Sequence, residues 1–295
     1  MVDESVKVRT APPTLRLVDS GMTNLIPTSV PWATPLADYL AWLRAAGRPP
    51  STLYQRSYQL RRFAHETHVE PFEATLDLLV EYLGSHSWGK ATQHAVRSAL
   101  RGFYEWAHIT DRIEENPARR LPQIRQPIGK PRPADDDSLE HGLRAADARV
   151  KLMLELAAGA GLRCCEIARV STDDLVEDLD GWSLRVLGKG GRIRVVPLTR
   201  RLALTLRSLP SGYTFPGQVD GHLSGAYVSK LVSLVLPDGV TAHMLRHRFA
   251  SRAYVGSGRD IRAVQELLGH SSVATTQVYT AVPDGAKRAG VEAAA

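Results

Sequence analysis

The sequence predicts a mainly α-helical protein with two domains: an N-terminal four-helix unit and an α-rich second domain that contains a small β-hairpin. Apolar residues recur at helical spacing along most of the chain, while one stretch, "WSLRVLGKGGRIRVVPL", alternates around a glycine-rich turn. The chain has 295 residues, of which 43% are hydrophobic, enough for one large or two medium domains with a real core.

Four helices are expected within residues 33–118, after a lead-in, residues 1–32, that has no sustained period. Thr34 is the expected N-cap of the first helix and Pro35 its first residue, and Ser51 is expected to cap the second. The third and fourth helices are "TLDLLVEYLG" and "KATQHAVRSALRGFYEWAHI". Short connections between the four predict a compact helical domain.

A proline-rich, basic segment, residues 119–136, is the expected linker because its prolines interrupt every regular period. The second domain is expected at 137–282, with a tail at 283–295. It opens on the apolar helix "DARVKLMLELAAGAGL" and continues with hairpin strands near 182–187 and 192–197. Helices then return up to the tail.

Composition narrows the function classes. A formal net charge of +6 favours a polyanionic partner such as nucleic acid, although alone it is weak evidence. The only cysteines, Cys164 and Cys165, are too few for a four-thiolate zinc site, and we expect small buried thiols in a reducing compartment. No apolar run approaches the roughly 20 residues that span a bilayer, and the first residues lack a signal-peptide centre. We therefore expect a soluble intracellular protein with no membrane partner.

Two segments place single cations where a core does not need them. In "AGLRCCEI", Arg163 directly follows an apolar helix, and an ordinary ion pair with Glu166 is the structural alternative to a functional role. Lys189 lies at the tip of the hairpin among three glycines, which allow a large ligand to approach closely. A simple exposed turn lysine is the alternative there.

A third segment, "TAHMLRHRFASRAYV", predicts a helix capped by Thr241. At about 100° per residue, His243, Arg246, His247 and Ala250 share one face. This face is cationic and near a helix N-terminus, where free N–H groups favour an anion. The small Ala250 would let a large ligand approach; a solvated basic face is the alternative.

The last segment, "LLGHSSVATTQVYT", presents His270 and, nine positions later, Tyr279 among small polar residues. In order and spacing, the four segments resemble the tyrosine recombinase (phage-type integrase) family, and the resemblance covers essentially residues 35–282. It implies a SAM-like core-binding domain, a basic linker and a catalytic domain.

The resemblance also implies roles for individual residues. Glu166 and His247 match supporting positions, and Cys165 stands where family members often carry serine. No metal and no other cofactor is implied. Six residues match the family's catalytic positions, the last as the nucleophile that forms an O-(3′-phospho-DNA)-tyrosine link: Arg163, Lys189, His243, Arg246, His270 and Tyr279.

These residue types suit cleavage of a phosphodiester. Two guanidinium groups can hold the non-bridging oxygens through bidentate, charge-assisted bonds. A free tyrosine has a pKa of about 10, so surrounding cations must lower the cost of the phenolate, and His243 is placed to accept its proton. A lysine on a turn can protonate the departing 5′-hydroxyl. In the family, a free 5′-hydroxyl then attacks the phosphotyrosine and rejoins DNA without ATP.

The resemblance implies double-stranded DNA as the partner, clamped between the two domains at specific core sites. Phosphate contacts would set affinity and its salt dependence, and a few base-edge contacts would set the site. It further implies a homo-tetramer on two sites, a monomer or weak dimer when free, and an accessory DNA-bending or directionality protein. Nine basic residues are candidate DNA contacts: Arg56, Arg61, Lys90, Arg97, Arg119, Arg120, Arg125, Lys130 and Arg132.

Several functions stay open at this stage. Integration or excision of a phage or mobile genome competes with Xer-like resolution of chromosome dimers. The lead-in of 32 residues is expected to be too short for an extra arm-site-binding domain, which favours either a Xer-like recombinase or a simplified integrase. A type IB topoisomerase shares the chemistry. A non-catalytic regulator with a helix-turn-helix in "FASRAYVGSGRDIRAVQELLG" would not need Tyr279. The expected location is the bacterial cytoplasm or nucleoid. The target sequence, and whether Tyr279 acts in cis or in trans, do not follow from the residues.

Overall fold

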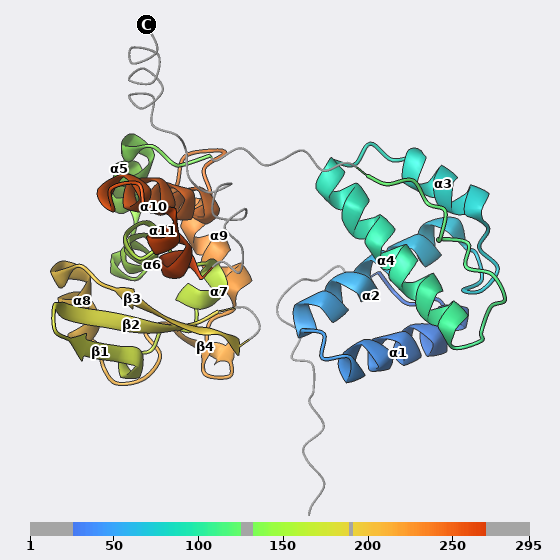
Figure 1. Cartoon of the computed structure of the whole chain (residues 1–295), viewed down its shortest axis with the longest axis horizontal. Coiled ribbons are helices and arrows are strands. Elements are labelled where there is room, and N and C mark those ends of the chain that lie inside the picture. Colours follow the sequence, from blue (N-terminus) through green and yellow to red (C-terminus); the bar gives the residue numbers. More distant parts are fainter. Residues whose placement is uncertain (1–25, 125–131, 189–190, 270–295) are drawn as a thin grey trace, which may run out of the picture. The chain divides into compact units, whose positions relative to one another are not determined.

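The structure is a computed structural model (Figure 1). It describes three stretches of the chain: residues 26–124, 132–188 and 191–269.

Its contacts divide the chain into two compact units. Among the described residues, one unit consists of Ala134–Val186 and Val195–Phe249. The other contains the N-terminal helices within Thr23–Pro133, together with Leu187–Arg194 and the described part of the stretch that begins at Ala250.

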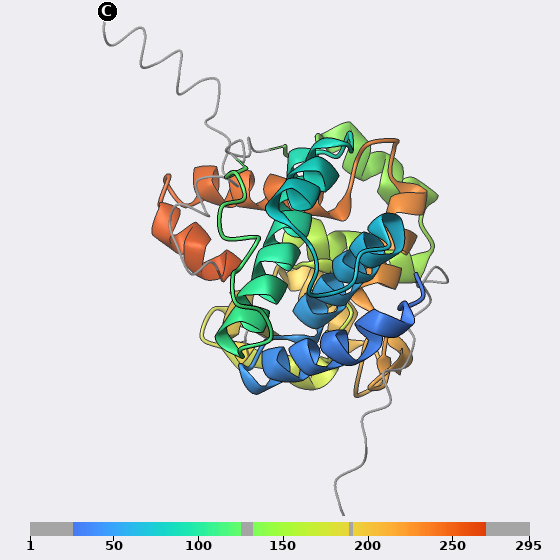
Figure 2. The same ribbon diagram turned by 90° about the vertical axis from the view of Figure 1, so that its right-hand side faces the viewer.

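The N-terminal helices form a bundle (Figure 2). Aromatic side chains make up much of its core. Helix α4 contributes Phe103, whose ring lies 5.0 Å from Trp32 and 5.6 Å from Tyr39, centroid to centroid. All three side chains are almost fully buried, so they contribute much of the apolar area that stabilises the bundle. The helices are α1 (Val30–Ala45), α2 (Pro50–Thr67), α3 (Leu76–Gly84) and α4 (Lys90–Ile109).

The third and fourth helices confirm the sequence prediction, whereas the starts of the first two correct it. Helix α1 begins at Val30 and contains Pro35, which was expected to open it. The longer helix brings Trp32 into the core, where the indole Nε1 donates to the Val69 carbonyl at 2.8 Å. Burying this large side chain outweighs the helix hydrogen bond that Pro35 cannot donate. Helix α2 begins at Pro50, one residue before the expected cap.

The other unit is also mainly helical. Two of its helices have the N-caps that helix starts prefer: Asp147 accepts from the Val150 amide, and Thr199 from the Leu202 amide. Its helices are α5 (Asp136–Ala145), α6 (Ala148–Gly159), α7 (Cys164–Ile167), α8 (Arg200–Arg207), α9 (Gly225–Val235) and the first part of α10 (Ala242–Gly256). Helix α11 (Ile261–Leu268) lies in the stretch that begins at Ala250 and is therefore grouped with the N-terminal helices.

A three-stranded sheet, in the order β1-β2-β3, accompanies these helices. Strands β2 (Gly181–Leu187) and β3 (Ile193–Pro197) confirm the predicted hairpin. Strand β1 (Leu175–Asp178) was not predicted; it pairs antiparallel with β2 in the register Leu175 to Leu184. A short strand β4 (Pro216–Val219) lies outside this sheet.

No helix within the described residues is long and apolar enough to cross a membrane.

We predict that Gly102→Ala destabilises the α1–α4 bundle by about 1–3 kcal/mol. The added Cβ would lie 2.5 Å from the hydroxyl oxygen of Tyr39, whose buried ring cannot withdraw. Urea unfolding followed by tryptophan fluorescence measures the loss, since four of the five tryptophans lie within residues 30–109, three of them in α1 and α4 and Trp88 in the connection before α4.

Tyr39→Phe in the same chain removes the clashing oxygen and should recover most of that stability. Gly84→Ala is the control, because a Cβ there meets nothing within 4 Å. A Gly102→Ala protein as stable as the wild type would show that α1 and α4 are not packed as described.

Candidate active site

A buried carboxylate holds the two arginines that the sequence singles out. Glu166, in α7, is 4% exposed, and its Oε1 accepts a 2.8 Å hydrogen bond from Nη1 of Arg163. Its Oε2 lies 3.6 Å from Nη1 of Arg246, which is 1% exposed. A buried charge is stable only when it is paired, and here one negative charge lies between two positive ones. The arginines, 83 positions apart in sequence, are therefore brought to one place.

The start of α7 fixes this carboxylate. Arg163 occupies the N-cap position, and its backbone N–H donates to Glu166 Oε2 at 2.9 Å. A glutamate three residues into a helix commonly reaches back to the N-cap amide in this way. Glu166 thus serves the helix start and the ion pairs together.

Gly161 is a site residue that the sequence analysis missed. Its carbonyl oxygen accepts a short hydrogen bond from Nη1 of Arg246. The residue has φ +65°, and a Cβ on it would lie 2.3 Å from a ring carbon of Phe249. Only glycine fits both the backbone and the space. The signal was present in "AGAGLR", where a glycine stands two residues before Arg163.

Two histidines of α10 complete the cluster. The rings of His243 and His247 lie 4.8 Å apart, and His247 is 7% exposed. His243 keeps exposed surface, yet crowding by neighbouring atoms lowers its pKa, and the charges of Arg246 and Arg163 lower it further. Its imidazole is therefore neutral at pH 7 and able to accept a proton.

The end of the basic segment lies on α10, the helix that carries these histidines. The Ala134 amide donates to the Met244 carbonyl at 3.0 Å. Arg248 donates through Nε to Asp136 Oδ1 at 3.1 Å, and also through Nη2 to the same oxygen. One backbone bond and one ion pair thus join the start of α5 to α10.

Two expectations about side-chain exposure were wrong. Ala250 was expected to leave room for a ligand, but it is fully buried, because α10 packs against its surroundings on that face too. Both cysteines were expected to be buried; Cys164 is half-buried and Cys165 is exposed. Burial raises the pKa of the Cys164 thiol.

Of the eight predicted catalytic and supporting residues, the structure brings five together: Arg163, Glu166, His243, Arg246 and His247. The other three, Lys189, His270 and Tyr279, lie outside the described residues. Their placement stays a prediction.

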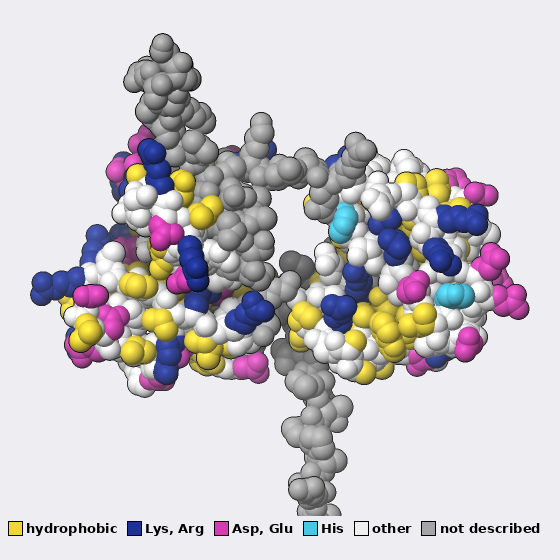
Figure 3. All heavy atoms as spheres, in the orientation of Figure 1, with side chains coloured by type: hydrophobic (Ala, Val, Ile, Leu, Met, Phe, Trp, Pro, Cys, Tyr) yellow, Lys and Arg dark blue, Asp and Glu magenta, His cyan; other side chains and the backbone are white. Residues whose placement is uncertain are grey.

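The candidate DNA contacts differ in exposure, and Figure 3 shows Lys and Arg side chains scattered over the face of the N-terminal helices that it draws. Lys90, Arg119, Arg120 and Arg132 are exposed, and Arg61 is half-buried. Arg125 and Lys130 lie outside the described residues.

Two of these candidates make hydrogen bonds within the α1–α4 unit. Half-buried Arg56 donates through Nη2 to Ser98 Oγ at 2.6 Å. Arg97 is 9% exposed and donates through Nη2 to the Leu121 carbonyl at 2.9 Å. Because Leu121 is itself part of the core, Arg97 fastens the chain after α4 to the bundle.

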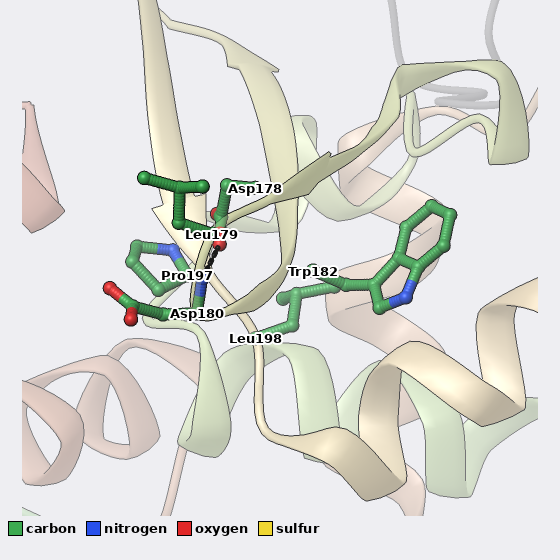
Figure 4. Close-up of a pocket in the computed structure, with 6 residues that line it drawn as sticks. All are labelled: Asp178, Leu179, Asp180, Trp182, Pro197 and Leu198. Carbon is green, nitrogen blue, oxygen red and sulfur yellow. Dashed lines mark hydrogen bonds between the residues drawn. The ribbon is translucent and has the colours of Figure 1, made fainter.

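A separate pocket lies in the unit that contains the sheet (Figure 4). It lies at the β1–β2 turn, where the Asp180 amide donates to Asp178 Oδ1 at 3.0 Å. Leu179, Trp182, Pro197 and Leu198 also line it, and the Trp182 ring points away from the aspartates in the close-up. Arg163, Glu166, His243, Arg246 and His247, the predicted site residues that the structure describes, do not line this pocket, so it is distinct from the cluster around Glu166.

We predict that Glu166→Gln destabilises the protein by about 3 kcal/mol or more, because it leaves the buried Arg246 and the half-buried Arg163 without their carboxylate. Denaturant unfolding followed by circular dichroism measures the change. Glu155→Gln is the matched control: Glu155 pairs with an 84% exposed Arg201 at 2.8 Å, and its loss should cost less than about 1 kcal/mol. Equal losses in the two variants would contradict the assignment of Glu166 as the buried bridge.

Comparisons with known proteins show the family of this chain. The Phage integrase family matches residues 136–285. Tyrosine recombinase XerC of Chromobacterium violaceum is 33% identical over 268 residues, which cover 83% of this chain and 88% of that protein. Tyrosine recombinase XerD of Caulobacter vibrioides is 31% identical over 285 residues, covering 85% and 92%.

A solved structure, a lambda integrase dimer bound to a COC′ core site, matches with a TM-score of 0.68 over 84% of this chain and 76% of that chain. At 19% identity this match shows a shared fold. With its clustered arginines, its family match and its relatives, the chain belongs to the phage integrase family of tyrosine recombinases, enzymes that cleave and rejoin DNA.

Proposed function

We propose that this chain is a site-specific recombinase that cuts duplex DNA with Tyr279 and rejoins it through a 3′-phosphotyrosyl intermediate. One observation carries the proposal: Arg163 and Arg246 converge on the buried Glu166 carboxylate. Two guanidinium groups fixed side by side match the two non-bridging oxygens of a phosphodiester, on which negative charge grows during attack.

The two arginines differ in the exposure of their side chains. The Arg163 side chain is 30% exposed, so part of its guanidinium is open to an incoming phosphate. Arg246 is almost fully buried, and a phosphate oxygen reaches it only after the covering atoms move aside. Glu166 contacts Nη1 of both groups, which fixes the orientation of the two guanidiniums toward a phosphate.

Proton transfers follow from the residue types. The Tyr279 oxygen bonds to phosphorus as the bond from phosphorus to the 5′-oxygen breaks. Neutral His243 accepts the phenol proton, and Lys189 donates a proton to the departing 5′-oxygen. His270 and His247 support the phosphate and the arginines. In the second half-reaction a 5′-hydroxyl attacks the phosphotyrosine, which releases Tyr279.

Double-stranded DNA is the proposed partner, in line with the solved lambda integrase dimer on its core site. Exposed Lys90, Arg119, Arg120 and Arg132 are the proposed phosphate contacts, together with Arg125 and Lys130. Half-buried Arg56 and Arg61 are proposed to face the same groove. Buried Arg97 is left out of this set because it already holds the Leu121 carbonyl.

Two uses of this chemistry compete. Integration and excision of a phage or mobile genome, which joins two different DNA sites, is the use that the texture of the sequence motifs favours. The similarity to XerC and XerD over most of the chain favours a Xer-like recombinase, which joins identical sites. Either use is proposed to take place in a homo-tetramer on two sites in the bacterial cytoplasm, assembled from monomers or weak dimers with an accessory DNA-bending or directionality protein.

We predict that the wild-type protein forms a covalent adduct with a nicked duplex carrying its site, and that Tyr279→Phe abolishes it, because the nucleophilic oxygen is gone. A denaturing gel of labelled DNA detects the adduct. Tyr254→Phe, in α10, is the control and should leave adduct formation unchanged.

Adduct formation and supercoil relaxation on any plasmid, without sequence preference, would indicate a type IB topoisomerase instead. A wild type that binds DNA and never forms an adduct would indicate a regulator.

We predict that, with purified protein, recombination between two different attachment sites exceeds that between two identical ones. The expectation follows from the integrase assignment, and a gel assay of joint products measures it. A preference for identical, dif-like sites would instead establish the Xer-like use.

A further inference from the structure

Arg194, on strand β3, makes a hydrogen bond that the proposed chemistry does not use. Its Nε donates to the carbonyl oxygen of Leu267 at 2.9 Å, a contact between residues 73 positions apart. Leu267 is the penultimate residue of α11, where carbonyl groups lack partners within the helix. A guanidinium at this end satisfies such a carbonyl and complements the negative end of the helix dipole.

The end of α11 is shaped for this arginine. Gly269 caps the helix with φ +64°, and its N–H donates to the Gln265 and Glu266 carbonyls. A Cβ on Gly269 would lie 2.9 Å from Cδ and 3.3 Å from Nη1 of Arg194. The glycine therefore provides both the left-handed turn and the room that the arginine needs.

The two ends of this contact lead directly to two proposed catalytic residues. On one side, Arg194 belongs to β3, which Lys189 precedes by four positions in the sequence, and the Gly188 amide donates to the Arg192 carbonyl at 2.7 Å. On the other side, the residue after Gly269 in the chain is His270.

We propose that Arg194 is a positioning residue that fixes the end of α11 to the β2–β3 hairpin and thereby sets where the chain delivers His270. The inference rests on the proposed function for the roles of His270 and Lys189, but not for the contact itself. Arg194 touches no reacting atom in this scheme and acts through the helix end.

Three variants test this role. Arg194→Met removes every donor while keeping an unbranched side chain, and Arg194→Lys restores one donor and the charge. Arg185→Met is the matched control: Arg185 is an exposed arginine of β2 that contacts the Asp173 carbonyl at 3.3 Å, remote in sequence from α11.

The first readout is made on the full-length protein without DNA. A hydrogen bond to a charged group shifts the equilibrium it stabilises by roughly tenfold to a hundredfold. We expect amides at the end of α11, Leu268 and Gly269 among them, to exchange at least about tenfold faster in Arg194→Met. The His270 imidazole resonance, identified by its loss in His270→Gln, should move, whereas those of His65 and His94 should not.

The second readout is the single-turnover rate of adduct formation on a nicked duplex, beside the affinity for the same duplex. Arg194→Met should slow adduct formation about tenfold or more with the Kd for DNA unchanged, and Arg194→Lys should recover most of the rate. Arg185→Met should match the wild type in amide exchange, the His270 resonance, the adduct rate and the Kd for DNA.

The outcomes separate the two claims. Unchanged amide exchange and an unmoved His270 resonance in Arg194→Met would overturn the positioning role whatever the activity. Faster exchange with a wild-type adduct rate would overturn it as well, since the contact would then serve stability alone. A moved His270 resonance in a protein that never forms an adduct would uphold the positioning and refute the proposed function.

Discussion

Two positive charges within a few ångströms of each other repel, and burial strengthens this repulsion enough to destabilise the folded state. The Glu166 carboxylate prevents this, and much of the local structure serves to put it between Arg163 and Arg246. The hydrogen bond from the Arg163 backbone N–H orients this carboxylate, and the Gly161 carbonyl accepts a further hydrogen bond from Arg246. The remaining features of the site depend on this one balance of charge.

Where the sequence carried a clear period, it was a good guide to the fold. Helix α4 spans the predicted residues, Lys90–Ile109, because its apolar positions recur at helical spacing over five turns. The start of α1 was missed, because burial of Trp32 is a tertiary effect that outweighs the local rule for Pro35. Strand β1, "LVED", alternates too weakly to be read alone; it exists because β2 supplies its partners.

For the site, the sequence predicted which residues take part but not how they are arranged in space. The motifs identified Arg163, Glu166, His243, Arg246 and His247, but periodicity said nothing of their mutual distances. Helical spacing put Ala250 on the cationic face correctly, yet exposure depends on what packs against that face, which a single helix does not encode. In the sequence, Gly161 resembles an ordinary glycine at the end of an apolar helix. Its purpose depends on Phe249 and Arg246, more than 80 positions away, and only the folded chain reveals it.

The bonds from Ala134 to Met244 and from Asp136 to Arg248 give α10 a mechanical connection. Met244 lies two residues before Arg246, within a single helical turn. A displacement of the chain that enters α5 is therefore transmitted through α10 to the backbone that carries Arg246.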